Sequence, residues 1–120
     1  MKDRRRDTRV VEENKVALRP LTAAAAGGST PVYHALTRDV SVGGLRLMTS
    51  APLEPGERVG LEITLGRSRR RLRAVAEVCW VRDLYAREVL EVGLRFVDLG
   101  PESELALMEY VFGGRRGRRG

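Results

Sequence analysis

The chain has 120 residues, a formal net charge of +6 and an aromatic content of 5%, and this length fits one domain with a core of its own. It has no apolar run as long as a membrane-spanning helix, and no apolar stretch of a signal peptide follows its charged start. The single cysteine, Cys79, excludes an intramolecular disulfide and most zinc sites, and it suits a reducing, cytoplasmic setting.

The positive charge is concentrated in three short segments. Residues 1–9 carry a net charge of +3, residues 67–73 carry +5 and residues 113–120 carry +4, so the rest of the chain carries −6. Almost all of these cations are arginines, whose planar fork suits phosphate and guanine. The clusters therefore indicate either an anionic partner or a solvated surface.

The N-terminal third is predicted to contain two strands behind a basic arm. Residues 1–14 form the arm, because the first nine are too charged to join a core. A first strand is expected over residues 15–19, where Pro20 ends it. Residues 22–30 have only small side chains between two threonines, which predicts a flexible loop, and weak alternation over residues 31–39 indicates a second strand.

Four more strands are expected from apolar residues that recur with a period of two, over residues 45–49, 59–65, 72–80 and 92–96. Trp80 is expected on the same face of its strand as Leu72 and Val78. A closed or nearly closed antiparallel barrel is the simplest arrangement of six such strands, because closure removes exposed edges.

The hydrophobic period changes after Gly100. A proline and two glutamates follow within four residues, as is typical of the first turn of a helix. Leu105, Met108 and Phe112 recur at helical spacing and are expected to form the apolar face that covers the barrel. The predicted organisation is thus an arm at 1–14, a barrel with a C-terminal helix at 15–112, and a disordered Arg/Gly tail at 113–120.

Two short motifs lie on this scaffold. Arg5 and Arg9 form Arg-x-x-x-Arg in the arm, and Asp39, Ser41 and Gly44 form Asp-x-Ser-x-x-Gly between the second and third strands. Each motif alone is weak, because arginine-rich termini produce the first by chance and the second uses ordinary turn residues. In this order and context the pair resembles the PilZ domain, the bacterial receptor module for cyclic di-GMP.

The resemblance covers residues 4–112. It includes Gly56 shortly before a strand, Trp80 near the end of a long strand, and a Gly-x-x-Phe strand that starts at Gly93. It implies an all-β fold, a six-stranded antiparallel β-barrel with a C-terminal α-helix. The long loop at 22–30 and the tail at 113–120 depart from the family pattern, but neither touches the motifs.

The resemblance also implies a cyclic di-GMP site made of Arg4, Arg5, Arg9, Asp39, Ser41, Gly44 and Trp80. Arginine pairs with guanine O6 and N7 or with phosphate, and its plane stacks on a purine. Asp39 would accept hydrogen bonds from guanine N1 and N2, and Gly44 would leave room for close approach. An arginine at the position of Arg4 tends in the family to accompany an intercalated ligand dimer, whereas Trp80 would either stack on a purine or pack in the core.

The implied function is that of a stand-alone receptor, which relays the cyclic di-GMP level to a protein partner and acts in motility or biofilm regulation. It would act as a monomer or as a ligand-dependent dimer, with an arm that is mobile without ligand and ordered with it. One alternative is a basic barrel that binds nucleic acid, which the scarcity of aromatic residues disfavours. The other is a PilZ-like adaptor that binds only protein.

Catalysis is not expected. His34 is the only histidine, no serine or cysteine lies in a recognisable nucleophile motif, and no cluster has the spacing of metal ligands. We therefore expect neither a metal nor a cofactor, and treat cyclic di-GMP as a ligand.

Overall fold

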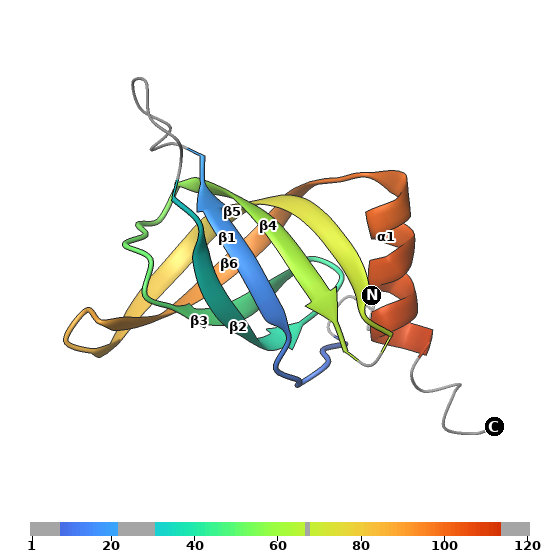
Figure 1. Cartoon of the computed structure of the whole chain (residues 1–120), viewed down its shortest axis with the longest axis horizontal. Coiled ribbons are helices and arrows are strands. Elements are labelled where there is room, and N and C mark those ends of the chain that lie inside the picture. Colours follow the sequence, from blue (N-terminus) through green and yellow to red (C-terminus); the bar gives the residue numbers. More distant parts are fainter. Residues whose placement is uncertain (1–7, 22–30, 67, 114–120) are drawn as a thin grey trace, which may run out of the picture.

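Figure 1 shows the computed structural model, which describes residues 8–21, 31–66 and 68–113. Six antiparallel strands close into a barrel in the order β1-β2-β3-β6-β5-β4, which confirms the predicted fold class. A helix follows the last strand, covers one end of the barrel and ends in a π-helical turn. The elements are β1 Lys15–Pro20, β2 Tyr33–Val40, β3 Gly44–Thr49, β4 Arg58–Leu65, β5 Arg70–Tyr85, β6 Val89–Leu99, α1 Pro101–Met108 and η2 Glu109–Gly113.

The barrel interior is filled by the apolar half of each alternating strand. In β4 every second residue from Val59 to Leu65 is at most 4% exposed, as the sequence pattern predicts. The core continues into the helix, where Leu107 is fully buried. The predicted loop at 22–30 and the tail after Gly113 lie outside the described residues.

The helix buries a different face from the predicted one. Leu105 and Met108 are 57% and 40% exposed, so the prediction that they cover the barrel is wrong, whereas Phe112 is partly buried against the core as predicted. Apolar residues at helical spacing occur on two overlapping faces of this segment, and spacing alone does not choose between them. Polar contacts fix the choice, because the hydroxyl of Ser103 accepts a hydrogen bond from the backbone of β5. The buried side of the helix carries Ser103, Ala106, Leu107, Tyr110 and Val111.

The pairing of neighbouring strands shifts register at four points, and two of these β-bulges, one in β2 and one in β5, change the face on which a site residue lies. In β2, Thr37 lies opposite Leu47 but Asp39 lies opposite Arg46, so Arg38 is the extra residue. A bulge inserts one unpaired residue into a strand and re-aims the residues that follow. The carboxylate of Asp39 is therefore turned to the outer face of the barrel, next to Arg46.

The second bulge has the same effect on Trp80. In β5, Val78 lies opposite Leu94 but Trp80 lies opposite Gly93, so Cys79 is the extra residue. Trp80 is 39% exposed, whereas Leu72 and Val78 are buried. The expectation that these three residues share one face is wrong, because the bulge between them shifts Trp80 to the outer face.

Candidate functional site

The two bulges create a row of outward-facing residues across four neighbouring strands. Asp39 on β2 lies opposite Arg46 on β3, Arg46 lies opposite Gly93 on β6, and Gly93 lies opposite Trp80 on β5. We call these four residues the outer row. Residues that lie opposite one another in a sheet are close enough for their side chains to interact, so the row places a carboxylate, a guanidinium and an indole side by side.

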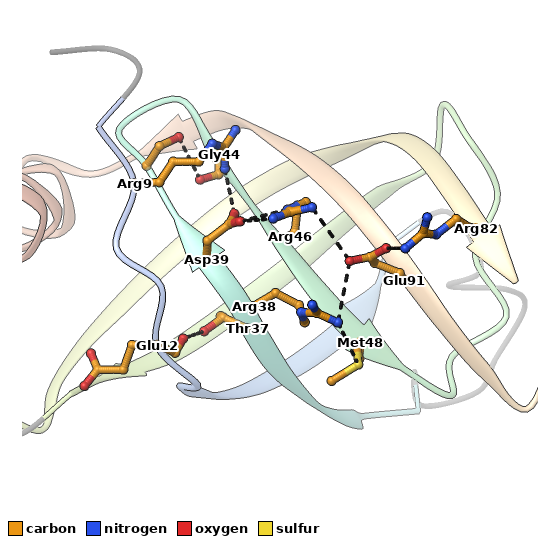
Figure 2. A network of polar contacts seen from close by, with 11 residues as sticks. Arg9, Glu12, Thr37, Arg38, Asp39, Gly44, Arg46, Met48, Arg82 and Glu91 are labelled. Carbon is orange, nitrogen blue, oxygen red and sulfur yellow. Dashed lines mark hydrogen bonds and ion pairs between the residues drawn. The ribbon is translucent and has the colours of Figure 1, made fainter. Parts of the chain in front are cut away.

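Asp39 is the centre of two ion pairs (Figure 2). Its Oδ1 accepts a hydrogen bond from Arg9 Nη1 at 2.6 Å, and its Oδ2 accepts bonds from both Nε of Arg46, at 2.8 Å, and Nη2 of the same guanidinium. Burial by itself raises the pKa of Asp39, but the hydrogen bond from Arg46 and the charges of Arg9 and Arg46 outweigh burial and lower this pKa below its ordinary value. The carboxylate is therefore ionised at neutral pH, although its side chain is only 2% exposed.

The turn between β2 and β3 is held by Ser41 and Gly44. The backbone N–H of Ser41 donates to the carbonyl of Gly44 at 2.8 Å, and the Ser41 hydroxyl donates to the same carbonyl at 3.2 Å. A Cβ on Gly44 would lie 2.0 Å from the carbonyl oxygen of Leu94. Glycine is thus required here by the close approach of β6, and the serine hydroxyl fixes the turn that leads into β3.

The indole of Trp80 lies across Gly93. A Cβ on Gly93 would be 2.2 Å from the indole Nε1, so only glycine leaves room for the ring in this position. Beside the ring is an open pocket of about 320 Å³. Its lining includes the predicted site residues Arg9, Ser41, Gly44 and Trp80, together with Arg46 and Arg95.

A second buried carboxylate, that of Glu91, lies beside the outer row. It is 1% exposed, accepts a hydrogen bond from Arg82 Nη2 at 2.7 Å, and has Arg38 and Arg46 each at 3.9 Å. Figure 2 shows the resulting chain of contacts from Arg9 through Asp39, Arg46 and Glu91 to Arg82. Sequence reasoning missed Arg46 and Glu91, because only the strand register shows that these charges meet.

The structure thus brings together five of the seven predicted site residues, namely Arg9, Asp39, Ser41, Gly44 and Trp80. Arg4 and Arg5 lie outside the described residues. The end of the predicted arm is paired with β2, because Val10 and Val40 exchange two backbone hydrogen bonds of 2.8 and 3.0 Å. Arg9 therefore approaches Asp39 from a backbone that is itself attached to the sheet.

Three other properties of the described part of the chain bear on function. Its titratable residues include no group of three or more His, Cys, Asp or Glu that could hold a metal ion. None of its helices is long and apolar enough to cross a membrane. Cys79, the extra residue of the second bulge, has a free and exposed thiol.

The sequence profile of the PilZ domain family matches residues 3–113. The chain belongs to the PilZ domain family. A search among curated proteins finds no match. The fold of this PilZ domain is shared by solved structures, at identities below 20% that show the fold alone.

Three of these structures show the range of proteins that carry the fold. The inhibitor of motility MotI/DgrA of Bacillus subtilis is 19% identical over 94% of this chain, with a TM-score of 0.68, and the chain spans only 52% of that protein. The PilZ domain of Escherichia coli YcgR, solved with cyclic di-GMP, is 18% identical with a TM-score of 0.64 and coverages of 92% and 91%. The PilZ domain of CeSA from a cellulose-synthesizing bacterium is 16% identical with a TM-score of 0.61 and coverages of 89% and 97%.

A separate polar cluster joins the segment before β1 of this PilZ domain to the barrel and the helix. The buried amide of Asn14 donates to Thr37 Oγ1 at 3.2 Å and to Tyr110 Oη at 2.9 Å, and it accepts from the backbone N–H of Gly66 at 2.8 Å. Burial and a hydrogen bond to Glu12 raise the pKa of Tyr110 well above its ordinary value, so its phenol remains a donor to Glu12. We call Asn14, Thr37 and Tyr110 the amide hub.

The arginine cluster at 67–73 makes ion pairs with other parts of the domain. Arg70 pairs with Glu109 of the helical end, and Arg73 Nε lies 3.2 Å from Glu62 on β4. Arg71 lies 3.9 Å from the same glutamate. These pairs neutralise part of the cluster, which weakens the interpretation that it binds nucleic acid.

Proposed function

We propose that this PilZ domain is a receptor for cyclic di-GMP, and that it passes the level of this ligand to a protein partner without catalysing a reaction. The observation that carries the proposal is the pairing of Arg9 with Asp39 beside the open pocket, because it unites the two motifs across thirty residues of sequence. The family match and the YcgR domain solved with cyclic di-GMP support it.

The chemistry of the pocket suits a guanine nucleotide. The ionised Asp39 can accept hydrogen bonds from the N1 and N2 donors of guanine, which adenine does not present in the same pattern. Arg9, together with Arg5 of the same motif, supplies guanidiniums for guanine O6 and N7 or for the phosphates. The exposed indole of Trp80 offers a face on which a purine can stack.

Three further parts of the proposal concern stoichiometry, output and location. Arg4 precedes the motif and would stack on a second ligand molecule, so the domain would bind an intercalated ligand dimer and act as a monomer or a ligand-dependent dimer. Ligand contacts would reposition residues 1–9 and change the surface that a partner meets. The similar structure of MotI, which is named as an inhibitor of motility, supports a role of this domain in motility. Biofilm regulation is a second process in which we propose that it acts. The exposed thiol of Cys79 suits a reducing cytoplasm.

Calorimetric titration of the full chain with cyclic di-GMP tests the proposal, because it reports affinity and stoichiometry together. Trp80 is the only tryptophan, so its fluorescence gives a second signal from the site itself. We expect Arg5→Ala and Arg9→Ala to weaken binding by about tenfold to a hundredfold, the value of one or two guanidinium contacts. Arg19→Ala is the matched control, since Arg19 is an exposed arginine on β1.

Unchanged affinity in both motif variants would overturn the site assignment. Absence of binding by the unmodified chain would favour one of the alternatives. A nucleic-acid-binding barrel would then show affinity for single-stranded RNA that falls steeply with salt, and a protein-only adaptor would bind neither ligand.

A further inference from the structure

The two arginines that pair with Asp39 are attached to the protein in different ways. Arg46 lies within β3, and its backbone is paired on one side with β2 and on the other with β6. Arg9 lies outside the strands, where the neighbouring Val10 makes a single isolated bridge to Val40. The guanidinium of Arg46 is therefore carried by a strand that is paired on both edges, whereas that of Arg9 is carried by a segment outside the strands whose nearest backbone attachment is the Val10–Val40 pair.

The side-chain contacts also attach Arg46 to Asp39 more firmly than Arg9. Arg46 uses both Nε and Nη2 on Oδ2 of Asp39, whereas Arg9 uses only Nη1, on Oδ1. Two N–H groups of one rigid fork that meet at a single oxygen hold the position of that oxygen more closely than a single contact does. The two guanidiniums are about equally exposed, at 47% for Arg9 and 43% for Arg46, so exposure does not explain the difference.

The other side of the Arg46 guanidinium faces Glu91. Its Nη1 lies 3.9 Å from Oε2 of this buried carboxylate, and Oε1 of Glu91 is bound by Arg82. Arg46 is thus placed between two carboxylates whose side chains are each 2% exposed, one on β2 and one on β6. Charge on both sides and strand pairing on both edges leave its guanidinium little freedom to leave Asp39.

We propose that Arg46 is a positioning residue of the cyclic di-GMP site, which holds Oδ2 of Asp39 while Oδ1 exchanges the Arg9 guanidinium for a donor of the guanine base. This inference rests on the proposed function. Arg9 is then released from Asp39 toward guanine O6 and N7 or a phosphate, and the carboxylate does not lose its orientation when Arg9 leaves. Arg46 thereby sets the selectivity of the site, because a fixed carboxylate repels the N1 acceptor that adenine presents where guanine has a donor.

The experiment compares affinities for cyclic di-GMP and cyclic di-AMP in Arg46→Gln and in Arg38→Gln. Arg38 is the matched control, because it is 46% exposed and lies as far from Glu91 as Arg46 does, but it does not hold Asp39. We expect Arg46→Gln to reduce the preference for cyclic di-GMP by about tenfold or more. Arg38→Gln removes the same charge and should leave the preference within about twofold. Thermal unfolding checks that both variants are folded.

A conservative variant separates charge from positioning. In Arg46→Lys the positive charge remains, but an ammonium lacks the planar fork that meets Oδ2 with two N–H groups. We expect this variant to recover part of the affinity for both dinucleotides and little of the preference between them. A full recovery of the preference would overturn the inference, since charge alone would then account for the role of Arg46.

A titration without ligand distinguishes failure of this inference from failure of the proposed function. The ¹³C resonance of the Asp39 carboxyl reports its pKa in the full chain, and we expect Arg46→Gln to raise this pKa more than Arg9→Gln does. Equal effects in the two variants, or an unchanged dinucleotide preference in Arg46→Gln, would overturn the positioning role. Absence of cyclic di-GMP binding by the unmodified chain would overturn the proposed function, and the exchange at Oδ1 with it.

Discussion

The segment that precedes β1 is joined to the barrel by two polar clusters of different chemistry. At its start, Arg9 pairs with a carboxylate of the outer row that is shared with a second guanidinium. At its end, Asn14 belongs to the amide hub, where neutral donors meet neutral acceptors at 2.8 to 3.2 Å. Both clusters attach residues 9–14 to the barrel. The first uses half-exposed guanidiniums on a buried carboxylate, and the second uses neutral amide and hydroxyl groups.

This difference between the two clusters means that anchoring to the barrel and ligand recognition are carried by different residues of one short segment. A buried neutral hydrogen bond is costly to leave unmade, so the amide hub fixes the segment against the barrel and the helix. The Arg9 guanidinium is 47% exposed and makes a single contact with Asp39, and Arg46 stays on this buried carboxylate when Arg9 leaves, so Arg9 can change partners at a smaller cost than a group of the amide hub. The stretch from Arg9 to Asn14 can therefore keep its position while the charged end exchanges Asp39 for a ligand.

The largest effect is expected from removal of the amide in Asn14→Ala. This change deletes three side-chain hydrogen bonds and leaves buried partners unsatisfied, so we expect the free energy of unfolding to fall by about 3 kcal/mol in chemical denaturation. Tyr110→Phe removes one hydroxyl of the same hub and should cost about 1 kcal/mol. Ligand affinity of Asn14→Ala is then measured under conditions in which this variant is still folded. An affinity loss as large as that of Arg9→Ala would show that the two clusters do not have separate roles.

A smaller loss of stability, with a larger change in the site, is expected for Gly93→Ala. The new Cβ would overlap the indole of Trp80, so the ring must leave its place on β6. We expect an altered tryptophan emission spectrum, a stability loss of about 1 kcal/mol and roughly tenfold weaker ligand binding from lost stacking. Gly100→Ala is the control, because no atom beyond the chain neighbours lies within 4 Å of a Cβ at that position and Gly100 does not line the pocket beside Trp80. Unaltered emission in Gly93→Ala would contradict the placement of the ring.

Acid should weaken the outer row before it affects the amide hub. The pKa of Asp39 is lowered from its ordinary value of 3.8, so on acidification the unfolded chain takes up this proton before the folded protein does. The stability that Asp39 contributes is complete above that ordinary value, and it is lost as the pH falls through the lower pKa of the folded state. Denaturation curves at a series of pH values should therefore show less loss of stability on acidification in Asp39→Asn than in the unmodified chain, and equal losses would contradict the pairing.

The smallest effect is expected at the exposed face of the helix that the amide hub holds. Leu105→Ala should change the free energy of unfolding by less than about 0.5 kcal/mol, because Leu105 is 57% exposed. Leu107→Ala, on the buried face next to Tyr110, should cost about 2 kcal/mol. The reverse order in thermal denaturation would show that the helix packs through the face first expected from its spacing.

The sequence was sufficient to predict the barrel, its six strands and the position of the helix. Alternation shows which strands have one buried face, and closure was predicted because it removes exposed edges and because the family resemblance implies a barrel. The two motifs, through the resemblance, also assigned Arg9 and Asp39 to one site although thirty residues separate them, but the ion pair between the two side chains was not predicted. The strands of the structure begin or end within a few residues of the predicted ones, apart from the long β5, which continues to Tyr85.

The remaining contacts of the site depend on strand register, that is, on which residues lie opposite one another in paired strands. The sequence pattern does not show this register. Arg46 and Glu91 looked like ordinary outward charges on two strands, and only the pairing of β3 with β6 shows that they are neighbours. Trp80 was expected on the face of Val78 because an unbroken period of two was assumed. Asn14 gave no signal, since a polar residue before a strand has no pattern that indicates an amide bonded to a tyrosine ninety-six positions away.

The extra residue in each bulge also has a consequence for engineering this domain. If Arg38 were deleted, Thr37 would still lie opposite Leu47 and Asp39 opposite Arg46, so the carboxylate would stay on the outer face in a strand that no longer has a bulge. A deletion of the extra residue at either bulge is therefore expected to damage the domain less than a one-residue deletion elsewhere in the same strand, which would turn the residues beyond it to the opposite face. In a regular strand of the same sequence, Asp39 would turn to the interior of the barrel. Transfer of the motif to another barrel would therefore require the bulge as well as the motif residues, because the bulge sets the face on which the carboxylate lies.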